Sequence, residues 1–192
     1  MPRIEPLDIE EIPKELREKI NAGSKRMGFR ANDGMTLARV PGLIEGLTAL
    51  TWAIYGEDGL VSSELKRMVS IITSTSSGCT YCQSHTVHGA EAAGIDEKKI
   101  KALWQYETNP LFSDAERAAL RVAQGAGHAP VKVTDSDFNE MKNYFDDNQI
   151  CEIVSIIALF GFLNKWNAII ATRIEPAPLQ SIKKLGPLAN AA

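Results

Sequence analysis

The sequence predicts an all-α fold, and three observations support this prediction. Apolar residues recur at steps of three and four through most of the chain, which is the spacing of an amphipathic helix. Ser, Thr and Asp, which favour helix N-termini, stand ahead of these segments. No segment shows the strict alternation of apolar and polar residues that indicates a half-buried strand. We therefore expect residues 1–192 to form one compact helical bundle.

The helix boundaries follow from proline, glycine and capping residues in chain order. Prolines within about residues 1–13 indicate an extended N-terminal arm. Pro41 is compatible with the first turn of a helix or with a kink, and Ser113 and Glu116 have the spacing of a capping box. The expected helices span residues 14–27, 36–55, 62 or 63 into the polar run 73–78, 79 to about 94, 96–106, 113 to about 124, 134 onward, and 149–172.

Two further segments bear on packing and assembly. Residues 153–163 are strongly apolar but cover about half of a membrane span, so we expect a buried helix. Three prolines fall within about residues 174–192. They predict a C-terminal tail that lies across a neighbouring subunit.

The composition argues against several partners and compartments. The chain has 21 Lys and Arg and 24 Asp and Glu, a net charge of −3. This balance gives no electrostatic reason to expect nucleic acid or an anionic membrane as partner. Three cysteines are too few for a secreted disulfide framework, and the acidic N-terminus lacks the apolar core of a signal peptide. We therefore expect a cytoplasmic protein, in which paired cysteines indicate redox or metal chemistry.

A short internal echo suggests a pseudo-repeat of helical pairs. Val69-Ser-Ile-Ile72 recurs as Val154-Ser-Ile-Ile157, at an offset of 85 residues. At the same offset, the cysteines of residues 79 and 82 correspond to Asn164 and Asn167. In this interpretation only the first half of the chain kept reactive groups.

The segment Cys79-Thr-Tyr-Cys82-Gln-Ser-His85 carries the candidate chemistry. Two cysteines three residues apart can form a disulfide when the first lies at a helix N-terminus, where free N–H groups and the helix dipole stabilise a thiolate. His85 lies about one turn beyond Cys82 and can take the thiol proton or give one to a leaving oxygen. His88, one turn further on, extends the pattern to CxxCxxHxxH.

Three interpretations of this pattern stay open, with a dithiol redox site preferred. A zinc site would take all its ligands from one ten-residue segment, whereas structural zinc sites usually separate the two ligand pairs by a dozen residues or more. Two buried structural cysteines are the third option. Gln83 stands where covalent haem attachment requires histidine, and the chain has no glycine-rich phosphate loop. We therefore expect no haem, flavin or nucleotide, and the preferred interpretation needs no metal.

Three segments resemble one known family. They are GCTYCQSHTVHGA at residues 78–90, with Glu64-Leu-Lys-Arg on the helix before it, and the downstream stretches 112–120 and 159–167. Together they are similar to the carboxymuconolactone decarboxylase superfamily, in its alkylhydroperoxidase D-like (AhpD-like), peroxidase-related branch. The resemblance covers about residues 35–175.

The resemblance implies a helical AhpD-like fold that assembles into trimers or hexamers and reduces hydroperoxides through the CxxC pair. Cys82 is then expected to attack the peroxide, and Cys79 to resolve the sulfenic acid and donate a proton. A dithiol protein or a small thiol re-reduces the disulfide. A histidine after the motif and a glutamate on the preceding helix form a proton relay, which we assign to His85 and Glu64.

Two departures from the family pattern affect this relay. The family histidine follows the second cysteine by four residues, where this chain has Thr86, and the family glutamate precedes the first cysteine by twelve, where this chain has Arg67. Arg67 and His88 are therefore further candidates for the relay. A lactone decarboxylase and a non-catalytic redox-sensing or metal-binding oligomer are the alternative functions. The intact CxxC favours the peroxidase.

Overall fold

Local capping signals set most of the helix starts. The Ser62 hydroxyl accepts the N–H of Leu65 at 3.1 Å and begins one helix, and Ser113 with Glu116 forms the expected capping box. In this computed structural model residues 1–56 and 58–185 are described. The α-helices are α1 (Lys14–Met27), α2 (Asn32–Leu37), α3 (Pro41–Tyr55), α4 (Ser63–Ser76), α5 (Thr80–Ala92), α6 (Glu97–Ala102), α7 (Asp114–Ala126), α8 (Asp135–Met141), α9 (Asp147–Ile170) and α10 (Pro176–Leu185).

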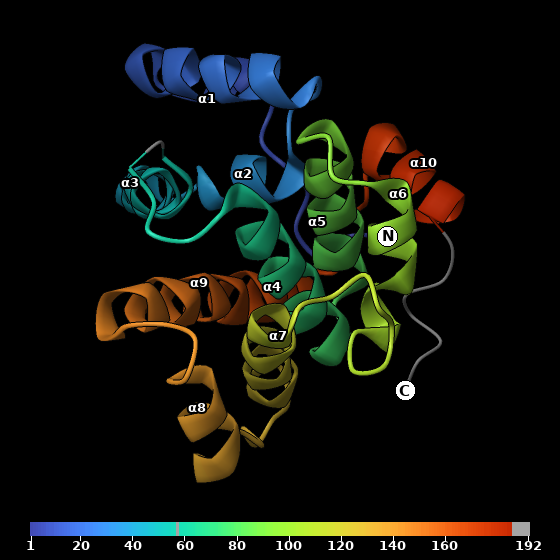
Figure 1. The fold of residues 1–192 in the computed structure, drawn as a ribbon. Helices are drawn as coiled ribbons and strands as arrows, with labels where there is room; N and C mark the ends of the chain where they lie inside the picture. Colours follow the sequence, from blue (N-terminus) through green and yellow to red (C-terminus); the bar gives the residue numbers. More distant parts are fainter. Residues whose placement is uncertain (57, 186–192) are drawn as a thin grey trace.

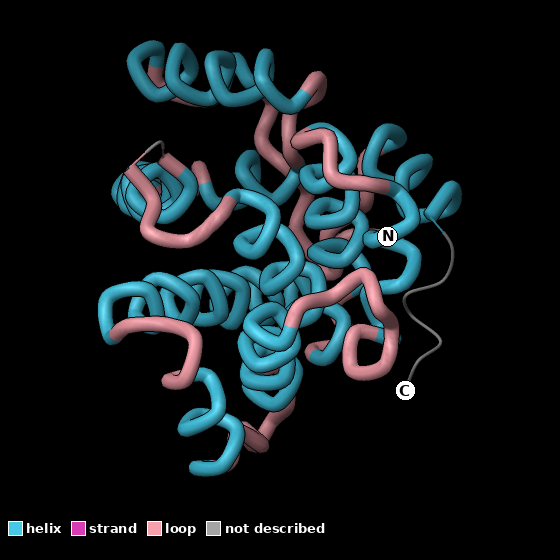
Figure 2. Tube along the Cα trace, in the orientation of Figure 1, coloured by secondary structure: helices cyan, strands magenta, loops and turns pink. Residues whose placement is uncertain are grey.

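Two 3-10 helices, η1 (Ile9–Glu11) and η2 (Leu103–Gln105), complete the regular structure. The described residues contain no strand (Figure 2). The all-α prediction is therefore confirmed. One expected helix, over residues 36–55, is instead two, because Pro41 begins α3 and the preceding chain forms the short α2.

The core lies around α4, which packs against α5, α7 and α9 (Figure 1). Fully buried side chains such as Met68 and Ile72 of α4, Leu120 of α7 and Ile153 of α9 fill this centre. Truncating one such side chain to alanine costs about 2–5 kcal/mol. A second apolar cluster joins the N-terminal arm to α1, α2 and α3.

Helix α9 satisfies the length and composition criteria for a membrane span. Its most apolar 18-residue window has a mean hydropathy of 1.7, and 39% of that window is buried within the molecule. A core helix of a soluble protein meets the same criteria, and α9 packs against α4, α5 and α7. We therefore treat α9 as a core helix, as expected for residues 153–163.

The N-terminal arm agrees with the sequence-based prediction, whereas the C-terminal segment differs from it. The arm is non-helical up to η1, and the Arg3 backbone N–H donates to the Ile170 carbonyl at 2.8 Å, which ties it to the end of α9. The expected C-terminal tail requires a correction. Within it α10 is a helix that packs against α5 of the same chain, where Lys184 pairs with Glu91 at 2.7 Å. Residues 186–192 of that tail lie outside the described residues.

Candidate functional site

The dithiol lies at the N-terminus of α5. Gly78, with φ of +68°, supplies the left-handed turn between α4 and α5. Cys79 is the N-cap residue, and its sulfur accepts the backbone N–H of Cys82 at 3.3 Å. Both cysteines are free and buried. The sequence-based expectation that the first cysteine opens a helix therefore agrees with the structure.

The two sulfurs have opposite proton affinities. The hydrogen bond from the Cys82 side chain lowers the pKa of Cys79; burial opposes this, and the Cys82 backbone N–H adds to the lowering. Burial raises the pKa of Cys82, and the neighbouring Cys79 raises it further. Cys79 is consequently the first of the pair to ionise, and Cys82 holds the remaining proton.

A buried carboxylate connects His85 to the motif. The His85 Nε2 atom lies 2.6 Å from Glu175 Oε2, and the Tyr81 hydroxyl donates to Glu175 Oε1 at 3.0 Å. The rings of Tyr81 and His85 stack with centroids 4.1 Å apart. Burial raises the pKa of Glu175, but the hydrogen bond and charge of His85 and the Asn32 backbone N–H outweigh it, so the pKa is lowered overall. Glu175 is therefore ionised at neutral pH.

A second set of contacts leads from Tyr81 to the Cys82 sulfur. The Tyr81 hydroxyl also lies 3.2 Å from Asp33 Oδ1. Asn167 Nδ2 lies 3.4 Å from Asp33 Oδ2 and 3.4 Å from Cys82 Sγ. The cluster thus draws on four parts of the chain: α2, the first turns of α5, the end of α9 and the residue before α10. Sequence reasoning missed Asp33 and Glu175, because neither lies in a motif.

The structure places the remaining predicted residues away from the sulfurs. Glu64 stands at the first turn of α4, roughly 18 Å of helix rise from its last residue, and pairs with Lys99 at 2.9 Å. The Arg67 guanidinium stacks over the Tyr55 ring at 4.6 Å. His88 Nδ1 bonds the Ser181 hydroxyl at 3.0 Å. The structure therefore brings together Cys79 and Cys82, places His85 against Tyr81 and Glu175 on the same helix, and leaves Glu64 outside the cluster.

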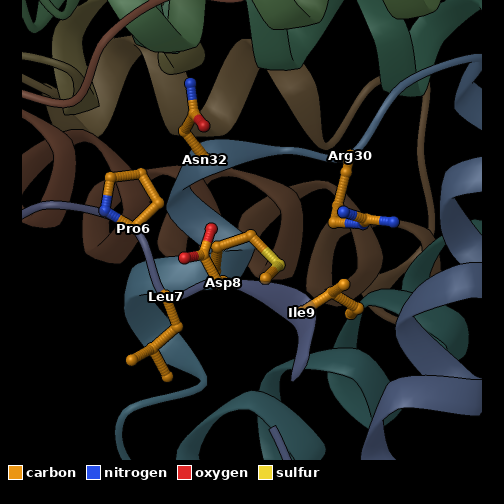
Figure 3. Close-up of a pocket in the computed structure, with 7 residues that line it drawn as sticks. Pro6, Leu7, Asp8, Ile9, Arg30 and Asn32 are labelled. Carbon is orange, nitrogen blue, oxygen red and sulfur yellow. The ribbon is translucent and has the colours of Figure 1, made fainter. Parts of the chain in front are cut away.

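Apolar side chains and a nearby cavity complete the surroundings. Phe160, Leu163 and Ile174 pack against the cysteine pair and Tyr81. A cavity of about 360 Å³ lies between the N-terminal arm and residues 30–35 (Figure 3). Its lining residues are Pro6, Leu7, Asp8, Ile9, Arg30, Asn32 and Met35. Of these, Asn32 connects the cavity with the site, because its backbone N–H donates to Glu175.

Within the described residues, no three His, Cys, Asp or Glu side chains are grouped as metal ligands. Near the sulfurs, Glu175 joins Tyr81 to His85, and Asn167 joins Asp33 to Cys82. The arrangement therefore favours thiol and proton-transfer chemistry.

Comparison with known proteins places this site in a family. The model of the carboxymuconolactone decarboxylase family matches residues 41–125, which include α4 and the dithiol. The "alkylhydroperoxidase AhpD core", an uncharacterized peroxidase-related protein from Ralstonia eutropha JMP134, is 27% identical, with a TM-score of 0.75 over 92% of this chain and 94% of that one. The chain belongs to the carboxymuconolactone decarboxylase family. Its fold is that of the AhpD-like branch.

Two other proteins are similar to this chain. The debrominase Bmp8 is 30% identical, with a TM-score of 0.88 over 95% of this chain and 97% of its own. A cysteine-to-alanine variant of Bmp8 has been solved in complex with 2,3,4-tribromopyrrole, with the same similarity. The uncharacterized protein YdfG of Bacillus subtilis (strain 168) is 25% identical over 60% of this chain and 77% of its own. The family and the AhpD-like fold support a role for this chain that is related to the peroxidases or to other enzymes of the family.

Proposed function

We propose that this protein is a dithiol oxidoreductase that reduces hydroperoxides and converts Cys79 and Cys82 to a disulfide. One observation carries the proposal: the sulfur of Cys79 caps α5 and accepts the N–H of Cys82, so a thiolate and a thiol stand within one helical turn. The opposite pKa shifts of the two cysteines support the same arrangement.

The cycle starts with one proton on the pair. The Cys79 thiolate takes the proton of Cys82, and the Cys82 thiolate attacks the terminal oxygen of the hydroperoxide. An S–O bond forms, the O–O bond breaks, and the leaving alkoxide takes the proton from Cys79. The products are an alcohol and a sulfenic acid on Cys82. The Cys79 thiolate then attacks the Cys82 sulfur, forming the disulfide and releasing hydroxide.

In this proposal His85 gives the proton that the leaving hydroxide needs. Ionised Glu175 accepts a hydrogen bond from His85 Nε2, so it fixes the orientation of the imidazole ring. Glu175 thus takes the place in the relay that sequence analysis assigned to Glu64. A dithiol protein or a small thiol returns the disulfide to the reduced state.

A second candidate function is reductive dehalogenation, and the similarity to Bmp8 over nearly the whole chain favours it. A thiolate can take bromine from a bromopyrrole carbon, which gains a proton in its place. The second thiolate then displaces bromide from the sulfur and closes the disulfide. The electron balance is the same as for a hydroperoxide, because one dithiol supplies two electrons in either reaction.

One experiment separates these possibilities. One equivalent of tert-butyl hydroperoxide is added to the reduced, metal-free protein, and the three cysteines are mapped by mass spectrometry over time. We expect a Cys79–Cys82 disulfide while exposed Cys151 stays reduced. Oxidation of the pair no faster than that of Cys151 would overturn the peroxidase proposal. A parallel sample with 2,3,4-tribromopyrrole, followed by bromide release, tests the second function.

We also propose that the chain assembles as a homo-oligomer, a trimer or hexamer. Apolar side chains stand exposed on two helices, with Trp52 67% exposed on α3 and Ile169 65% exposed on α9. Exposed apolar groups of this kind are typical of protein–protein contacts when they gather on one face. Light scattering should give a multiple of the 21.0 kDa chain mass. A 21 kDa particle would contradict the assembly.

A further inference from the structure

The amide of Asn167 contacts the sulfur that the proposed cycle oxidises. Asn167 is 2% exposed, and its Nδ2 atom has three neighbours. These are Cys82 Sγ at 3.4 Å, Asp33 Oδ2 at 3.4 Å and the Leu163 carbonyl at 3.0 Å. Its Oδ1 atom is buried and has no hydrogen-bond partner among the described residues. A buried amide therefore faces the Cys82 sulfur with its Nδ2 atom, and its Oδ1 atom stays without a partner among the described residues.

The surroundings determine which way this amide faces. The Asp33 carboxylate and the Leu163 carbonyl accept hydrogen bonds and cannot donate them. The amide must turn its NH₂ group toward them, because the reverse orientation would place three oxygens together. The same NH₂ group is the one that faces Cys82 Sγ, so the contact to the sulfur is a donated hydrogen bond.

We propose that Asn167 is a catalytic residue that stabilises the Cys82 thiolate, and that Asp33 is the positioning residue that holds its amide. This inference rests on the proposed dithiol cycle, in which Cys82 must ionise before it attacks. Burial opposes that ionisation, and a donated N–H favours it.

Asp33 has two separate effects on the thiol. Its Oδ2 atom engages the Asn167 amide, and its Oδ1 atom accepts the Gly34 backbone N–H at 2.7 Å and lies 3.2 Å from the Tyr81 hydroxyl, whose proton goes to Glu175. The carboxylate is therefore fixed at both oxygens and can in turn fix the amide. Its negative charge also raises the pKa of Cys82, so its role here is to orient Asn167.

Asn164 provides a matched control on the same helix. It lies one turn before Asn167, is 4% exposed and is likewise an asparagine on α9. Its Nδ2 atom donates to the Ser77 hydroxyl at 3.1 Å. Replacing either asparagine with leucine keeps a side chain branched at the γ carbon and removes one buried amide, but only the change at residue 167 removes an N–H from Cys82.

The test measures the Cys82 pKa without peroxide turnover. In a Cys79→Ser, Cys151→Ser background Cys82 is the sole thiol of the chain, and the pH dependence of its alkylation by iodoacetamide reports its pKa. We expect Asn167→Leu to raise this pKa by about one unit, with Asn164→Leu unchanged. We expect Asp33→Ala to leave Cys82 accessible but to lose part of the N–H stabilisation, so that adding Asn167→Leu has a smaller effect in that background.

Turnover provides the second measurement, with all three cysteines present. Asn167→Leu should lower the rate of peroxide reduction at pH 7 about tenfold and shift its pH profile upward, with part of the rate recovered at higher pH. Asn167→Ala serves the same purpose if the leucine variant does not fold by circular dichroism. An unchanged Cys82 pKa in either folded variant overturns the inference, even if the protein is an active peroxidase. A raised pKa in a protein that does not reduce peroxide keeps this inference for the thiol and rejects the peroxidase proposal.

Discussion

His85 and His88 lie one turn apart on α5 and have similar surroundings on one side. Each ring meets Phe29 edge-on at a centroid distance of 5.4 Å. On the other side they differ. His85 contacts the buried carboxylate of Glu175, which also holds Tyr81, whereas His88 contacts the hydroxyl of Ser181 and, at 3.4 Å, the carbonyl of Met27.

The two histidines therefore differ in their hydrogen-bond partner, a carboxylate for His85 and a hydroxyl for His88, and this partner decides which proton-transfer role each ring can have. The hydrogen bond to the ionised Glu175 carboxylate fixes the ring of His85, the histidine that we propose as the proton donor of the dithiol cycle. Ser181 instead donates its own proton to Glu91 at 2.6 Å, and Glu91 is already paired with Lys184. His88 therefore helps to join α5 to α10. The pattern CxxCxxHxxH contains one candidate catalytic histidine and one structural one.

The largest effect is expected at the start of α5. Cys79→Ser and Cys82→Ser should each lower peroxide turnover on the order of a thousandfold or more, because each removes one half of the dithiol. Cys151→Ser, an exposed control on α9, should stay within about twofold of the wild-type rate. Steady-state consumption of tert-butyl hydroperoxide with a dithiol reductant measures all three. Substantial multiple turnover by either motif variant would show that no disulfide is formed in the cycle.

The second largest effect is expected at the two histidines of α5, whose replacement should change kcat/KM to different extents. We expect His85→Gln to lower kcat/KM about a hundredfold, within the usual range for loss of a general acid. His88→Gln, which keeps a hydrogen-bonding side chain toward Ser181, should change it by less than about twofold. The pH–rate profiles of both variants check the assignment. Equal losses in the two variants would remove the distinction between the two turns of α5.

How far the sequence predicts this structure depends on how local each signal is. The bounds of α1 and the capping box of α7 were predicted because the residues that determine them lie within one turn of each other. The position of Cys79 at the start of α5 was predictable for the same reason. Glu175 was not, because it lies 90 residues from His85 and in a segment expected to be a tail.

Glu64, which was assigned to the relay because residues one helical turn apart share a face, lies outside the cluster for a different reason. Residues one turn apart share a face, but α4 runs its full length before Gly78 turns the chain into α5. Its first turn is therefore far from the cysteines. By contrast, the offset of 85 did align Asn167 with Cys82, and the two side chains are in contact. The helix pair is not repeated, however, because α9 continues unbroken where that offset would place the turn after α4.

Glu175, beside His85, and Glu91, beside Ser181, should contribute differently to the free energy of unfolding. The pKa of Glu175 lies below its ordinary value of 4.5, so the folded state favours the ionised form. This stabilisation is present above pH 4.5 and is lost as the pH falls through the lower folded-state pKa. We expect Glu175→Gln to reduce the free energy of unfolding at pH 7 by about 1–3 kcal/mol and to flatten its dependence on pH below 4.5. Urea denaturation from pH 3 to 7 measures both.

Glu91→Gln is the matched variant at the other end of α5. Its pKa is also lowered, first by Lys184, but the pair is at the surface and should contribute below about 1 kcal/mol. A loss at Glu91 as large as that at Glu175 would mean that burial is not what distinguishes the two carboxylates.

Glu64→Gln should have the smallest effect, and it tests whether the relay belongs to α5 and α10 at all. The Glu64 side chain is 44% exposed, and its partner Lys99 keeps a second carboxylate, Glu116, at 2.7 Å. We therefore expect a loss of less than about 1 kcal/mol in the free energy of unfolding and an unchanged rate of peroxide reduction. Parallel assays of Glu64→Gln and Glu175→Gln compare the two carboxylates under the same conditions. If the rate falls in the Glu64 variant but not in the Glu175 variant, the relay carboxylate is Glu64 on α4. The contact between Glu175 and His85 would then have no part in proton transfer.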